Sequence, residues 1–142
     1  MQLTSGQREF IESNPSAAMI TIGGDGYAKA VRVGVAIVDG NLWSSGTLDR
    51  LRTWRLRQDP RCTLFVFGSG YDALTLETVV TIIEGGGAVP RSVELFRAMQ
   101  GRPDGSLVWY GEELDEETFR RKMIDQKRLI YQFEVMKAYG VA

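Results

Sequence analysis

A run of arginines is the sharpest chemical feature of the sequence. Residues 50–61 hold five arginines against one acid, and these are Arg50, Arg52, Arg55, Arg57 and Arg61. A predicted strand ending in Ser44-Ser45-Gly46-Thr47 comes just before them, and a helix is predicted to begin just after it. Backbone N–H groups at a helix start, small hydroxyl side chains and nearby guanidinium groups together suit a phosphate. Because Arg50 and Arg52 are two apart, both reach one anion only if the first turn is irregular or if they flank it.

A solvated helix face is the plain alternative for this segment. Serine and threonine before a helix are common capping residues. Trp54 would then anchor the helix while the arginines face water. The sequence leaves both interpretations open.

Other candidate ligand-binding residues lie in one strand and in two glycine-bounded loops. Arg32 stands in an otherwise apolar strand, and a buried arginine is rare unless it is paired. It either faces solvent or contacts an anionic or planar ligand along that strand. The pairs Tyr71-Asp72 and Trp109-Tyr110 carry rings that can stack on a planar ligand. The alternative for these aromatic pairs is packing under a loop or at a dimer interface.

Composition excludes several kinds of catalytic site. The chain has no histidine and a single cysteine, Cys62, which excludes Ser-His-Asp and Cys-His machinery, histidine metal sites and an intrachain disulfide. We therefore expect no metal. A net charge of −1 argues against a nucleic-acid binder. The sequence lacks a transmembrane-length apolar run and a secretory leader, so we expect no membrane association and a cytoplasmic location.

Hydrophobic periodicity and turn signals divide the chain into short helices and longer strands. Thr4 and Gln7 form a capping box that starts a helix ended by Asn14-Pro15. Further helices are expected over 47–58, over 90–100 and after Asp115, with a loop over 101–111. The six expected strands are 16–22, 27–38, 41–45, 61–67, 73–84 and 128–138, with a bulge or bend near Glu77-Thr78.

These elements predict a mainly β fold with short inserted helices. Turn signals at Gly23–Gly26 and Asp39-Gly40 indicate hairpins, so residues 16–45 are expected to form a three-stranded antiparallel meander. Six antiparallel strands usually close into a small barrel, which removes exposed edges. At 142 residues with 44% hydrophobic content, the chain is expected to form one domain over residues 1–142.

The order and spacing of motifs over nearly the whole chain resemble the pyridoxamine 5′-phosphate oxidase-like split β-barrel superfamily. A strand with small hydroxyl residues at its end is followed by Arg-x-Arg at residues 50–52, LRQDPR at 56–61 and CTLFVF at 62–67. The upstream DGYAKAVRVGVAIVDGNLW and the closing RLIYQFEVMKAYG extend the match. Within the superfamily, the chain is most similar to flavin/deazaflavin oxidoreductases that use coenzyme F420, in which a basic pair precedes RNLRRDPR.

The resemblance assigns cofactor-binding roles to particular residues. Those implied to bind the cofactor phosphate are Ser45, Thr47, Arg50 and Arg52. Those implied to lie along the (deaza)isoalloxazine ring are Arg32, Val33 and Gly34. The resemblance also implies a homodimer with cofactor sites at the interface, where Tyr71 or Trp109 reaches the partner's site.

The implied function is an F420-dependent oxidoreductase in which the reduced cofactor delivers hydride to a small organic acceptor. The sequence identifies no catalytic residue of the protein's own, and the proton is expected from solvent or a tyrosine. The local excess of arginine favours F420, which carries a polyanionic tail, over FMN. The alternatives are an FMN-binding protein of the same fold and a non-catalytic protein that binds a flavin or another planar ligand.

Three departures from the family pattern bear on these assignments. Arg55 replaces the family's asparagine, and Arg52 replaces a usual lysine while keeping the positive charge. The chain also lacks the C-terminal arginine/histidine motif of true pyridoxamine 5′-phosphate oxidases. We therefore do not expect the activity that gives the superfamily its name.

Overall fold

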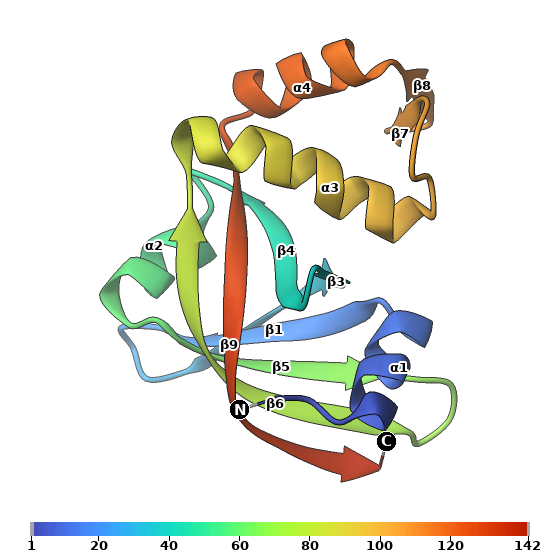
Figure 1. Cartoon of the computed structure of the whole chain (residues 1–142). Helices are drawn as coiled ribbons and strands as arrows, with labels where there is room; N and C mark the ends of the chain where they lie inside the picture. Colours follow the sequence, from blue (N-terminus) through green and yellow to red (C-terminus); the bar gives the residue numbers. More distant parts are fainter. Residues whose placement is uncertain (1, 142) are drawn as a thin grey trace.

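One strongly curled antiparallel sheet forms the main body of the protein (Figure 1), in a computed structural model that describes residues 2–141. Its strands lie in the order β2-β1-β5-β6-β9-β4-β3. In chain order they are β1 (Ser16–Ile22), β2 (Ala28–Gly34), β3 (Ala36–Val38), β4 (Asn41–Thr47), β5 (Arg61–Phe67), β6 (Ala73–Ile83) and β9 (Arg128–Val141). The predicted mainly β, antiparallel fold is confirmed as a half-barrel, but the sheet has seven strands and not six.

Four α-helices accompany the sheet in the described part of the chain. They are α1 (Ser5–Ser13), α2 (Leu51–Gln58), α3 (Ala88–Gln100), which follows the short 3₁₀ turn η1 (Gly85–Gly87), and α4 (Glu116–Asp125). The predicted capping box is confirmed, because Gln7 N donates to Thr4 Oγ1 and Thr4 N donates to Gln7 Oε1. None of these helices has the length and apolar content needed to cross a membrane. In Figure 1, α3 and α4 lie together above the sheet, whereas α1 and α2 lie at opposite ends of β1 and β5.

The strand predicted over residues 27–38 is wrong as a single element, because it breaks at Val35. The backbone N–H of Val35 donates to the Pro15 carbonyl at 3.0 Å. The part before the break, β2, pairs with β1, and the part after it, β3, pairs with β4. Since β2 and β3 are the two ends of the sheet order, Val35 joins the two edges and the sheet must curl back on itself. Both hairpin pairings of the expected meander over 16–45 are present, β1 with β2 and β3 with β4, but the break at Val35 places them at opposite edges of the sheet order, so they do not form one continuous three-stranded unit.

β9 is the longest strand, and it pairs on both sides. Against β6 its register shifts where Glu77 faces Lys137 but Thr78 faces Val135, which leaves Met136 as an extra residue. The irregularity predicted near Glu77-Thr78 is therefore confirmed, with the extra residue in β9. A bulge increases local twist and bends a strand, so this one contributes to the curl of the sheet.

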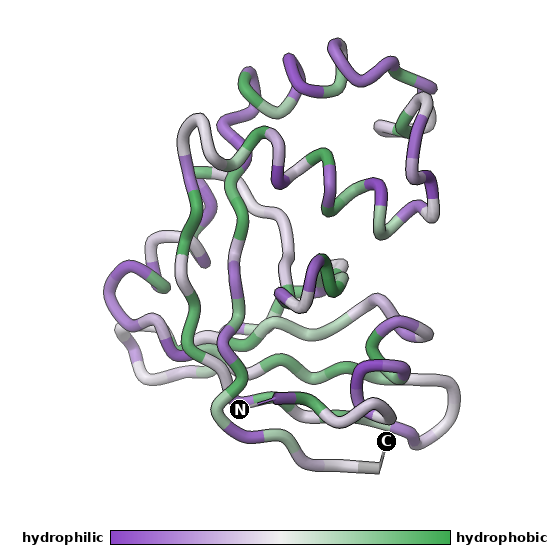
Figure 2. Tube along the Cα trace, in the orientation of Figure 1, coloured by the Kyte–Doolittle hydropathy of each residue, from purple (hydrophilic) through white to green (hydrophobic). Residues whose placement is uncertain are grey.

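The inner face of the curled sheet holds the main hydrophobic core. Leu64, Leu76 and Tyr131 are fully buried there, and α1 contributes Ile11. The hydropathy-coloured trace shows hydrophobic stretches along the strands and a largely hydrophilic α4 (Figure 2). Burial of this apolar surface is the main force that holds the strands in their curled arrangement.

A second, smaller core joins α3, α4 and a hairpin of two short strands. The hairpin consists of β7 (Leu107–Trp109) and β8 (Glu112–Leu114), so the loop expected over 101–111 is wrong in its second half. The Trp109 ring lies edge-on to Phe96 and to Phe119, with centroids 5.4 and 5.7 Å away. These aromatic contacts give the hairpin a hydrophobic support that its glycine-flanked sequence does not suggest.

Gly46 lets β4 approach the buried Tyr131, and this contact yields a prediction. A Cβ atom at Gly46 would overlap the ring and hydroxyl of Tyr131, whereas one at Gly24 in the β1–β2 turn would meet nothing. We expect Gly46→Ala to lower the free energy of unfolding by about 1–3 kcal/mol because it overpacks the core, and Gly24→Ala to change it little. Urea unfolding of both variants measures this. Equal stability of the two variants would show that β4 does not lie against Tyr131.

Candidate anion site at the ends of β4 and β9

Two arginines of the 50–61 run flank the start of α2. Arg50 is the N-cap residue, with an extended backbone at φ −70° and ψ 141°, and Arg52 is the second residue of the helix. Arg50 Nε donates to Thr47 Oγ1 at 3.2 Å, which ties Arg50 to the end of β4. The first turn therefore meets the condition under which both arginines can approach one anion.

The other three arginines of the run have partners elsewhere. Arg55 Nε donates to Thr21 Oγ1 at 2.8 Å. Arg57 forms two 3.0 Å hydrogen bonds with Glu84, and Arg61 lies 2.8 Å from the Asp59 carboxylate. The structure thus separates Arg50 and Arg52 from the rest of the run.

A third arginine, which the sequence reasoning missed, joins them from the far end of the chain. Arg128 is the first residue of β9 and pairs with Thr47 in the β4–β9 ladder. Its guanidinium lies 4.9 Å from the centre of the Trp109 ring. Arg50, Arg52 and Arg128 are called the arginine cluster below. No local signal marks Arg128, because only the register of two distant strands places it there.

The arginine cluster has no acidic counterpart. None of its members forms an ion pair within residues 2–141, although most ion-paired cations of the protein are other arginines. Burial lowers the pKa of Arg52 and of Arg128, and the neighbouring arginine charges lower both pKa values further. Arg52 Nε is buried with no hydrogen-bond partner in the described structure, while its guanidinium lies over the Tyr131 ring. Such unpaired charge is costly, and an anion would offset the cost.

A cleft of about 750 Å³ opens beside the cluster, and we call it the anion cleft. It is lined by Thr47, Leu48, Asp49, Arg50, Tyr110, Asp125, Gln126, Lys127 and Arg128. Two carboxylates, Asp49 and Asp125, also face it, and neither forms an ion pair with a described residue. The Thr47 hydroxyl donates to Asp49 at 2.7 Å and lowers the pKa of that carboxyl. The cleft therefore holds three lining cations against two acids, with Arg52 beside it.

Backbone strain gathers in the anion cleft. Among the described residues, three that are not glycine have a left-handed backbone: Asp39, Tyr110 and Lys127, with φ of 50°, 49° and 53°. Asp39 occupies an ordinary hairpin turn, but Tyr110 and Lys127 both line the anion cleft. Strained residues of this kind are found preferentially at functional sites, which supports this cleft as one.

The remaining residues predicted to bind cofactor are not all brought to the cluster. Arg32 lies 3.4 Å from Ser16 Oγ and over the Phe67 ring at 5.6 Å, at the end of β5 away from α2. Val33 is buried in the core, and the Gly34 carbonyl accepts a 2.6 Å hydrogen bond from Ser44 Oγ, which links β2 to β4. The exposed Tyr71 lies in the loop after β5.

Ser45 and Trp109 take different positions around the cluster. Ser45 faces Ile130 in the ladder, under α3, and its buried hydroxyl has no hydrogen-bond partner in the described structure. Trp109 contacts the cluster of its own chain through Arg128. Within one chain, the structure thus brings Thr47, Arg50, Arg52 and Trp109 together and leaves Arg32 and Tyr71 at the other end.

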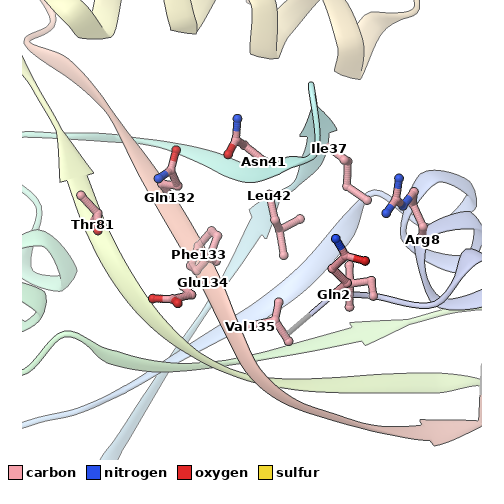
Figure 3. A pocket seen from close by; sticks show the side chains of 12 residues that line it. Gln2, Arg8, Ile37, Asn41, Leu42, Thr81, Gln132, Phe133, Glu134 and Val135 are labelled. Atoms are coloured by element: carbon pink, nitrogen blue, oxygen red, sulfur yellow. The ribbon is translucent and has the colours of Figure 1, made fainter.

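Other parts of the molecule suit this chemistry less well. A cavity of about 390 Å³ lies between α1, the β3–β4 turn and β9 (Figure 3), and both polar side chains, such as Arg8, Asn41 and Gln132, and apolar ones, such as Leu42 and Phe133, line it. None of the predicted cofactor residues lines it. Burial raises the pKa of Cys62 to about 12, so that thiol is not a nucleophile. No cluster of acidic, cysteine or histidine side chains within residues 2–141 could hold a metal ion.

Solved structures with the same fold include proteins of several kinds. The conserved hypothetical protein Rv2991 of Mycobacterium tuberculosis superposes with a TM-score of 0.75 at 22% identity, over 98% of this chain and 84% of that one. An F420 reductase superposes with a TM-score of 0.68 at 16% identity, over 96% and 98%. A pyridoxamine 5′-phosphate oxidase-like protein of Listeria innocua superposes with a TM-score of 0.63 at 12% identity, over 93% of this chain and 92% of that one.

The fold is therefore that of the pyridoxamine 5′-phosphate oxidase-like split barrels, as the sequence resemblance predicts. The haem storage protein HutZ of Vibrio cholerae also shares it, with a TM-score of 0.68 at 11% identity over 99% of this chain and 95% of that one. No family model and no curated protein sequence matches the chain. At these identities the likeness establishes the fold, and the function has to be argued from the site.

The strain at Lys127 yields a prediction with opposite effects on stability and binding. Lys127→Gly relieves the left-handed backbone and should raise the free energy of unfolding by up to about 1 kcal/mol. It also removes a cation from the anion cleft and should weaken pyrophosphate binding about two- to fivefold. Denaturant unfolding and calorimetric titration measure the two effects.

Asp39→Gly is the matched control, because it makes the same backbone change in a remote hairpin turn. It should leave pyrophosphate binding unchanged. If both glycine variants bind pyrophosphate as the wild type does, Lys127 is not part of an anion site.

Proposed function

We propose that this protein binds a phosphate-bearing flavin-type cofactor, with coenzyme F420 favoured over FMN, and acts as an oxidoreductase on a small organic acceptor. The observation that carries the proposal is the arginine cluster, three guanidinium groups with no acidic partner at the start of α2. The split-barrel fold, shared with an F420 reductase and with pyridoxamine 5′-phosphate oxidase-like proteins, supports it.

The residues at the cluster fit a cofactor phosphate. Arg52 Nε is a buried donor that lacks a partner, and the Arg50 guanidinium is held at the end of β4 by its hydrogen bond to Thr47 Oγ1. The Thr47 hydroxyl now donates to Asp49 and would turn from that carboxylate to the phosphate. Guanidinium groups bind phosphate through paired, charge-assisted hydrogen bonds. These three residues, with Arg128, would hold the phosphate and would lose some of their mutual repulsion on doing so.

F420 is favoured over FMN because the cationic site is larger than one phosphate requires. Arg128 and Lys127 extend the positive charge along the anion cleft beyond Arg50 and Arg52. A ligand with further negative charges would gain from this extension. The ring-binding roles proposed for Arg32, Val33 and Gly34, and for Tyr71, then involve the other end of the sheet, which a second copy of the chain would have to bring to the cluster.

The chemistry of the proposed reaction belongs to the cofactor, which supplies a hydride when reduced. The protein's residues would hold the anionic part of the cofactor and so orient it. No ionisable side chain of the cluster can act as a proton donor at neutral pH, because guanidinium groups remain protonated. The proton is therefore assigned to solvent or to a tyrosine, and Tyr110 is the one that lines the anion cleft.

Haem storage, the role named for one protein of the same fold, is less well supported for this chain. The chain contains no histidine, which is a common axial ligand of haem iron. A non-catalytic protein that binds a planar anionic ligand remains the second candidate, since the arginine cluster serves it equally well. Turnover of a nitro or enone acceptor by the cofactor-loaded protein separates the two.

Cofactor binding is the direct test of this proposal. Fluorescence titration with F420 and with FMN should show binding well below 100 µM for at least one of them. Arg50→Ala and Arg52→Met should each weaken it at least tenfold, because each removes a charge-assisted hydrogen bond of about 1.5–3 kcal/mol.

Arg61→Ala is the matched control, since Arg61 belongs to the same run but pairs with Asp59. It should bind the cofactor normally. Dissociation constants above roughly 100 µM for both cofactors, about 5.5 kcal/mol of binding free energy or less, would refute the function. Unchanged binding by the two cluster variants would refute the assignment of the phosphate.

We also propose a homodimer formed through the outer face of the sheet. Ile22, Phe65, Met136 and Tyr139 are large apolar side chains exposed there by 39–57%. Phe65 lies opposite Ala18 of β1 and Thr75 of β6 in the register, near the middle of this face. An apolar sheet face left open to water is typical of an interface.

Phe65→Asp should convert the dimer to a monomer, because it places a charge within the apolar face. Sedimentation equilibrium measures the mass of both forms. Ile124→Asp, an exposed apolar residue of α4 changed in the same way, should remain dimeric. A monomeric wild type, or a dimer that survives Phe65→Asp, would contradict the proposed interface.

A further inference from the structure

A second cleft, which the proposed function does not use, adjoins the anion cleft. It measures about 520 Å³, within the usual range of small-molecule sites. Five of its lining side chains are apolar, and these are Leu48, Val89, Met123, Ile124 and Leu129. We call it the apolar cleft. Leu48 and Ile124 are 45% and 62% exposed, so part of this apolar lining is open to water and available to a ligand.

The two clefts are continuous at three residues. Leu48, Lys127 and Arg128 line both of them. The apolar side chains of one cleft and the cations of the other therefore meet at a common boundary. The end of α4 and the turn that follows it supply both kinds of group, since Ile124 in the last turn of the helix and Lys127 after it lie three residues apart.

The positive charge at this boundary is not neutralised by an ion pair within the described residues. Neither Lys127 nor Arg128 forms an ion pair with a described residue. Glu84 also lines the apolar cleft, but both of its oxygens accept hydrogen bonds from Arg57. Asp49 and Asp125 are the other acids close by, and they line the anion cleft and not the apolar one.

We propose that the apolar cleft binds the chain of an apolar carboxylate, whose carboxylate group lies on Lys127 and Arg128. An apolar chain would cover the exposed Leu48 and Ile124 side chains, and its burial would supply most of the affinity. The carboxylate would take the place of the acidic partner that the two cations lack. A neutral apolar ligand would leave the cations unpaired, and a small anion would leave the apolar lining exposed. The proposal does not require the cofactor to bind, although the carboxylate and the anionic part of the proposed cofactor would compete for Lys127 and Arg128.

The experiment is a calorimetric titration of the full chain with straight-chain carboxylates from hexanoate to decanoate, below the concentrations at which they form micelles. Each added methylene should tighten binding about fourfold, as expected for 0.8 kcal/mol of transfer free energy. Affinity that is independent of chain length would overturn the proposal, because it would show contact with surface cations alone.

Two variants separate the apolar and charged parts of the site. Ile124→Asp should weaken octanoate binding at least tenfold, whereas Tyr27→Asp, the same kind of change at an exposed aromatic residue elsewhere, should not weaken it. Lys127→Met should weaken octanoate binding about fivefold and leave 1-octanol binding unchanged. Octanoate binding by Ile124→Asp at wild-type strength would overturn the site, and an unchanged Lys127→Met would overturn the role of the charge.

Titrations with F420 and with FMN are run separately on the same protein, so that the two proposals fail separately. Octanoate binding by a protein that binds neither cofactor would refute the proposed function and leave the carboxylate site standing. Cofactor binding without chain-length-dependent carboxylate binding would refute the carboxylate site and leave the proposed function standing. Thermal unfolding of each variant confirms that the compared proteins are folded.

Discussion

The pairing of β9 along both of its sides is the constraint on which the rest of the structure depends. One side pairs with β6 for most of the length of β9, and the other pairs with β4 from Leu42 to Thr47. The second ladder brings Tyr131 against β4 at Gly46, and it brings Arg128 beside Thr47. The core contact and the site therefore come from one register, and a slip by one residue would turn these side chains to the other face.

The same register places Arg128 close to Arg50 and Arg52, and none of these three arginines forms an ion pair with a described residue. Arg57 and Arg61 show that this chain can pair its arginines with acids, one distant and one nearby in the sequence. In the arginine cluster, by contrast, Arg52 and Arg128 are half-buried without an ion-paired acid and Arg50 is exposed, while the nearby Asp49 accepts a hydrogen bond from Thr47. Burial without a partner costs free energy, and the left-handed backbones of Tyr110 and Lys127 add to that cost. These two unfavourable features lower the stability of the folded protein. A ligand that supplies negative charge to the arginine cluster is the explanation that fits them best.

Local signals in the sequence were enough to predict most of the elements. The capping box at Thr4 and the Asp39-Gly40 turn are short-range features, and both are confirmed. The break at Val35 could not be predicted, because valine is an ordinary strand residue. Only its hydrogen bond to Pro15 and the two separate ladders reveal the break. The β7–β8 hairpin was missed because its aromatic support comes from α3 and α4.

The candidate site follows the same division as the fold. The part that lies in one short segment could be predicted from the sequence, and the part that depends on the pairing of distant strands could not. The segment from Thr47 to Arg52 lies in one short stretch, and its residues meet in the structure. Tyr110 was marked in the sequence only as a loop aromatic beside Trp109, whereas Arg128 and Lys127, also from the C-terminal third of the chain, carry no motif. Arg128 and Lys127 join the cluster through the β4–β9 ladder and the fold of α4.

The central claim is that the arginine cluster is an anion site whose positive charge the protein leaves without an ion-paired acid. Thermal unfolding of the wild type and of the double variant Arg52→Met/Arg128→Met tests it most directly, with and without pyrophosphate at constant ionic strength. The account predicts that the variant unfolds at a higher temperature than the wild type without pyrophosphate, and that pyrophosphate stabilises the wild type alone. A wild type that does not respond to pyrophosphate, or a variant that is less stable without it, would contradict the account.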